Sequence, residues 1–142
     1  MKTNQTLTRQ MGSFSVYQRT SDGMFNATAL LKQWNGHSGQ QKNMGQYFDQ
    51  SSVSEFIVAL CEDENIDCTD FIKHRNSAKN SLSGIYTKKR GIDGGTWMHP
   101  LLFIDFAMWL NPAFKVKVLK FVYDQLIQYR NDAGDTYKEM AA

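Results

Sequence analysis

The chain has 142 residues, of which 42% are hydrophobic and 13% aromatic, and its formal net charge is +2. This length suits one domain with a single core, and this composition excludes an intrinsically disordered chain. No run approaches the roughly 18 apolar residues of a membrane span, and the polar N-terminus lacks an apolar signal segment, so we expect no membrane partner. Cys61 and Cys68 lack the spacing of a metal site and favour a reduced, intracellular protein.

Charge is distributed along the chain in blocks. Residues 43–70 hold seven acidic residues and no Lys or Arg, whereas residues 71–92 hold six Lys or Arg and no acidic residue. Such blocks favour one basic and one acidic face on the folded domain. Ordinary solvated loops would give the same counts, so both interpretations stay open on charge alone.

The chain should begin with a polar arm and a β-hairpin. Residues 1–11 are polar, and we expect them to form a flexible N-terminal arm. Apolar and polar side chains alternate over residues 14–20, which predicts a half-buried strand. Ser21-Asp22-Gly23 is typical of a hairpin turn, and Met24-Phe25 begins a returning strand.

Two short helices joined by a polar loop are predicted next. Asn26 is typical of a helix N-cap, and Asn35-Gly36 is typical of a helix end. Between them an apolar stripe recurs at helical spacing: Ala27, Leu30, Leu31 and Trp34. Met44, Tyr47 and Phe48 predict a second helix over about 43–50.

This helical pair resembles a helix–turn–helix, whose second helix would present polar side chains to DNA. Asn and Gln can hydrogen-bond the edge of adenine. The candidate base-reading residues are Gln40, Gln41, Lys42, Asn43 and Gln46. The same core periodicity occurs in any small helical domain, so these side chains could equally be solvated turn residues.

An acidic helix follows. Residues 52–55 form a capping-box pattern, and the helix they open has the apolar face Phe56, Ile57, Leu60 and Cys61. Its acidic side chains, within 55–70, could dock a basic partner, which makes a protein-interaction module the alternative function. Lys73 and Arg75 lie beyond it and could either contact phosphates or keep a loop soluble.

The strongest pattern covers residues 84–112. A strand with Lys88, Lys89 and Arg90 at its outer end leads into a glycine-rich turn, and a second strand runs up to Pro100, which starts an apolar helix. This predicts a hairpin with a cationic tip, suited to a nucleic-acid backbone. From Pro112 to about residue 130 a last helix should bury Phe114, Val118, Phe121, Val122 and Leu126. Residues 131–142 should be a polar tail.

Two blocks of the sequence resemble the KilA-N domain family. Residues 25–31, FNATALL, resemble its FNATxLxK element, and residues 95–110, GTWMHPLLFIDFAMWL, resemble its GGTWxHPxLxxxFAxWLxP block. The likeness covers roughly residues 12–128. It implies a small α+β, APSES-like domain that binds DNA through a helix–turn–helix and a wing. By position, the second helix would begin near Lys42 and the wing would be the hairpin at 85–99, although the segment at 36–46 has no strong family pattern.

We therefore expect an α+β domain over residues 12–130 that binds double-stranded DNA without catalysis or cofactor. It would act in the cytoplasm of a bacterium or a phage-infected cell, as an antirepressor-like regulator. A homodimer or a protein partner stays open. Gly84-Ile85-Tyr86 matches half of a GIY-YIG nuclease pattern, but no YIG follows, so a nuclease is the less favoured alternative. A metal site from Cys61, Cys68 and His74 fails on spacing.

Overall fold

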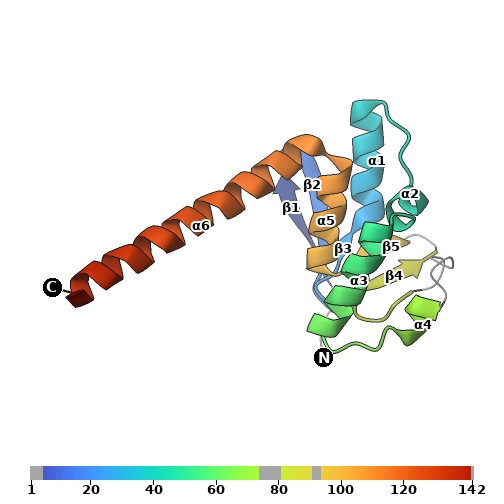
Figure 1. The fold of residues 1–142 in the computed structure, drawn as a ribbon. Coiled ribbons are helices and arrows are strands. Elements are labelled where there is room, and N and C mark those ends of the chain that lie inside the picture. The colour runs from blue at the N-terminus through green and yellow to red at the C-terminus, as the bar shows by residue number, and fades with distance from the viewer. Residues whose placement is uncertain (1–4, 74–80, 91–93, 142) are drawn as a thin grey trace.

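The computed structural model describes residues 5–73, 81–90 and 94–141 (Figure 1). Within these residues the domain is α+β, with five strands in one antiparallel sheet and six helices. The strands are β1 (Thr6–Met11), β2 (Phe14–Arg19), β3 (Phe25–Asn26), β4 (Tyr86–Lys89) and β5 (Gly95–Met98), in the sheet order β1-β2-β3-β5-β4. The helices are α1 (Ala27–Ser38), α2 (Met44–Phe48), α3 (Ser51–Asp63), α4 (Thr69–Lys73), α5 (Pro100–Leu110) and α6 (Pro112–Ala141). The α+β class expected from the sequence is confirmed.

The sheet joins two hairpins that lie far apart in the sequence. β3 pairs with β5 through Phe25 opposite Met98 and Asn26 opposite Trp97, so the two family-like blocks are neighbours in space. Gly95 has a φ of 122°, and a Cβ there would lie 2.9 Å from the Thr28 side chain. Glycine allows both this backbone conformation and this close approach of β5 to α1.

The core lies between the sheet and helices α1 and α5, which cover one face of it (Figure 1). Leu102, Phe106 and Ala107 of α5 are fully buried, because this helix is surrounded by α1, β5 and α2. Asn26 caps α1 by accepting a 3.0 Å hydrogen bond from the backbone of Ala29. His99 and Pro100 start α5, as the sequence predicted.

Four local predictions were wrong. The expected arm at 1–11 contains β1, which pairs along its whole length with β2. α1 continues through Gly36 to Ser38 and ends at Gly39, whose φ of 75° is left-handed. α3 begins at Ser51 after Gln50, without a side-chain cap, so the capping box at 52–55 does not form. The residues expected as a polar tail continue α6 as far as Ala141.

The burial expected for the last helix is also wrong. Phe121, Val122 and Leu126 are 65%, 46% and 64% exposed. α6 leaves the body of the domain after its first turns and projects away from it (Figure 1). Only Phe114 and Val118 of the five predicted core residues are even partly buried.

Candidate nucleic-acid interface

The β4–β5 hairpin is anchored at its base and cationic toward its tip. Tyr86 pairs with Met98, both buried on the helix-covered face of the sheet, and Lys89 pairs with Gly95 at the outer end. Lys89 and Arg90 are exposed. Residues 91–93 of the expected turn lie outside the described residues. The predicted hairpin is therefore present, with two exposed cations where the strand leaves the sheet.

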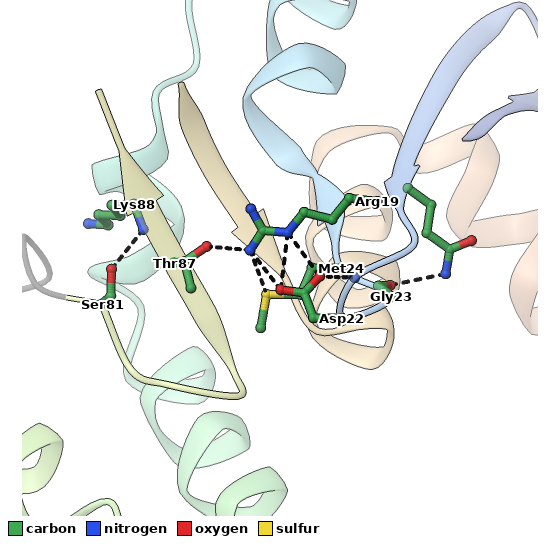
Figure 2. A network of polar contacts seen from close by, with 8 residues as sticks. Arg19, Asp22, Gly23, Met24, Ser81, Thr87 and Lys88 are labelled. Carbon is green, nitrogen blue, oxygen red and sulfur yellow. Dashed lines mark hydrogen bonds and ion pairs between the residues drawn. The ribbon is translucent and has the colours of Figure 1, made fainter. Parts of the chain in front are cut away.

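Lys88 has a different environment from its two neighbours. Its side chain is half-buried, with Nζ 5.0 Å from the centre of the Phe48 ring and 5.9 Å from that of Tyr86. Burial lowers the pKa of this ammonium group. Its backbone N–H donates to Ser81 Oγ at 2.8 Å (Figure 2). Lys88 thus links the hairpin to α2 by a cation–π contact.

The opposite face of the sheet carries an arginine network that sequence reasoning missed (Figure 2). Arg19 donates to both oxygens of the Asp22 carboxylate, from Nε at 2.9 and 3.0 Å and from Nη2 at 2.8 Å, and Nη2 also donates to Thr87 Oγ1 at 3.0 Å. Its guanidinium carbon lies 4.8 Å from the centre of the Trp97 ring. Arg19 therefore joins the β2–β3 hairpin to the β4–β5 hairpin. A sequence signal existed, because Arg19 precedes the predicted turn and Asp22, three residues later, lies within it.

The contacts with Arg19 lower the pKa of the Asp22 carboxyl. Burial alone would raise the pKa of its carboxyl, but hydrogen bonds from Arg19 and from the backbone of Met24, together with the arginine charge, hold that pKa below its usual value. The side chain is thus a carboxylate that pairs with Arg19 and orders the turn. Trp97 is 6% exposed beneath this cover, and its Nε1 has no hydrogen-bond partner in the described part of the chain.

α2 is fixed to α5 by aromatic side chains. Tyr47 is fully buried, and its hydroxyl donates to Asp105 Oδ2 at 2.6 Å. Its ring packs against Phe106 and Trp109. Burial, then the hydrogen bond and charge of Asp105, raise the pKa of Tyr47 well above its usual value. Phe48 contacts Tyr86 with ring centres 5.0 Å apart, so α2 and β4 lie side by side.

The predicted base-reading residues all surround α2, and four of the five take part in local contacts. Gln40 accepts from the Trp34 indole at 3.0 Å. Lys42 lies 4.6 Å from the centre of the Trp109 ring and donates to the Trp109 carbonyl. Asn43 and Gln46 form a capping box in which each side-chain oxygen accepts a backbone N–H of the other.

The remaining predicted site residues are less tightly defined. Gln41 is exposed. Lys73 is the last residue of α4, and Arg75 lies outside the described residues. Glu62, Asp63 and Glu64 are exposed at the end of α3, which is the acidic surface of the alternative function. His99 is structural: Nδ1 accepts from the backbone of Leu101 at 3.1 Å, and Nε2 lies 2.9 Å from Glu64 Oε1.

Neither a metal nor a membrane site emerges from the described residues. Among them, His, Cys, Asp and Glu side chains form no group of three or more able to hold a metal ion. None of the helices in that part of the chain combines the length and the apolar content needed to span a bilayer.

The fold is a small α+β domain in which a basic hairpin lies beside a short helix that exposes Gln46. Such a surface is suited to nucleic-acid phosphates. The family model for the KilA-N domain matches residues 10–127, so the chain belongs to the KilA-N domain family. KilA-N domains are in general DNA-binding and not catalytic, which supports a DNA-binding role here. No curated protein and no solved structure gives a significant match.

Proposed function

We propose that this chain is a non-catalytic domain that binds double-stranded DNA, with the β4–β5 hairpin on the phosphate backbone and α2 in or near the major groove. The observation that carries the proposal is the side-by-side placement of α2 and β4, with Lys89 and Arg90 exposed at the end of the strand. Cations in such a position neutralise phosphates and release counterions.

The three hairpin cations have different roles in this proposal. Lys89 and Arg90 are exposed and free to reach phosphates. Lys88 stacks on Phe48, so it holds the hairpin in register with α2 and adds its charge to the same surface. Lys73 and Arg75 would extend the phosphate contacts.

Base readout would come from residues 40–46. The capping box already uses the side-chain oxygens of Asn43 and Gln46 as acceptors, whereas their NH2 groups have no hydrogen-bond partner within the described chain. Donors suit the acceptors on a base edge, such as O6 and N7 of guanine or O4 of thymine. Gln41 is a further exposed amide. Gln40 and Lys42 would shape the loop that presents the other three.

The biological setting is also a proposal. A domain of this kind in a phage-derived or bacterial regulator would act in the cytoplasm, where the DNA is, in an antirepressor-like role. The family assignment supports this only through the DNA-binding character of KilA-N domains.

Fluorescence anisotropy with a mixed-sequence duplex tests the proposal. Binding should weaken linearly in a plot of log K against log salt, and Lys89→Ala/Arg90→Ala should make the slope shallower by about 1–2. Lys115→Ala/Lys117→Ala on α6 is the matched control, since it removes the same charge from exposed positions elsewhere. If both double variants lose affinity and slope equally, the hairpin is not the phosphate-binding element. If the unmodified protein does not bind at low salt, the DNA proposal is wrong.

A further inference from the structure

α6 carries an apolar stripe that its own domain does not cover. Large side chains on it are between 40% and 64% exposed: Val116, Leu119, Val122, Tyr123, Leu126 and Ile127. Figure 1 shows the helix projecting away from the sheet and the other helices. Surface helices normally turn such a stripe toward a core, and an exposed contiguous apolar patch marks an interaction site.

The stripe has the spacing of a helix–helix seam. At 3.6 residues per turn, its six members fall on one side of the helix, and Lys117, Lys120 and Asp124 fall on the other. Leu119, Val122 and Leu126 follow the alternating spacing of three and four residues that is typical of a and d positions in coiled coils. The partner that fits this surface is another helix.

We propose that the occupant is a second copy of this chain, whose α6 packs against the first along this stripe. Each of the six side chains exposes on the order of 100 Å², so the stripe would bury roughly 600 Å² per chain and about 1,200 Å² in total, within the range of specific interfaces. A two-fold axis lets one self-complementary patch cover itself. The inference rests on α6 alone and is independent of DNA binding.

Sedimentation equilibrium of the DNA-free chain across roughly 1–200 μM tests the dimer. Leu119→Glu/Leu126→Glu should weaken association by more than about 100-fold, because it buries charge at the centre of the seam. Phe121→Glu is the control: Phe121 is 65% exposed but lies on the far side of the helix. Near-UV circular dichroism reports whether the body stays folded. A monomer at every concentration, or equal loss of association in the control variant, overturns the proposal.

Discussion

Arg19 offers the sharpest test of how the two hairpins are held together. Arg19→Ala removes the ion pair with Asp22, the hydrogen bond to Thr87 and the cation–π contact with Trp97. The arginine side chain is 18% exposed and that of Asp22 36%, so the ion pair is worth at most about 1 kcal/mol. The hydrogen bond and the ring contact add about 1 kcal/mol each. We expect the free energy of unfolding to fall by about 2–3 kcal/mol.

Urea unfolding followed by tryptophan fluorescence measures this loss, since Trp97 lies directly under the guanidinium. At a urea dependence of about 2 kcal/mol per molar, the midpoint should fall by about 1–1.5 M. Arg9→Ala is the matched control: Arg9 is an exposed arginine on the neighbouring strand, and its Nε donates to Gln18 Oε1. It should cost less than about 0.5 kcal/mol. Similar losses in the two variants would refute the role given to Arg19.

Three further predictions concern the hydrogen bonds and backbone of the domain. Tyr47→Phe should lower the free energy of unfolding by about 1–2 kcal/mol, because the hydroxyl that donates to Asp105 is lost inside the core; an unchanged urea midpoint would contradict this. Gly95→Ala should cost more than about 2 kcal/mol, given its positive φ and the 2.9 Å clash, whereas Gly36→Ala in open space within α1 should stabilise by roughly 0.5–1 kcal/mol; calorimetry of both should show opposite signs. Because the folded pKa of Asp22 is below its ordinary value of 3.8, its stabilisation is present above that pH and lost as pH falls through the lowered pKa, so Asp22→Asn should flatten this part of the acid-unfolding profile.

Local signals predicted the elements that depend on neighbouring residues. The β2–β3 hairpin, the Asn26 cap and the helix start at Pro100 all follow from turn and capping chemistry within a few positions. β1 was missed because five of its six residues are exposed, so its sequence lacks the alternation of apolar and polar residues that marks a half-buried strand. The end of α1 was placed too early because Gly36 resembles a helix end, although glycine is tolerated inside a helix at about 1 kcal/mol.

α6 shows why periodicity cannot locate a partner. An apolar stripe at helical spacing looks the same whether it packs on its own domain or on another molecule, and Val122 and Leu126 were therefore assigned to the core. The cationic strand of the candidate interface could be predicted from the sequence, because Lys88, Lys89 and Arg90 are consecutive. The different environment of Lys88 depends on Phe48, 40 residues away in the sequence, and no local pattern could show it.

The central claim is that α2 and the β4–β5 hairpin together form the DNA surface. Amide NMR spectra of the 16.3 kDa chain, recorded while a short duplex is added, test it most directly. We predict that the largest shifts fall on Gln41, Gln46 and Lys89, with small shifts at Glu62 and Asp63 on α3. Shifts concentrated on α3, or spread evenly over the sheet and helices, would contradict the account.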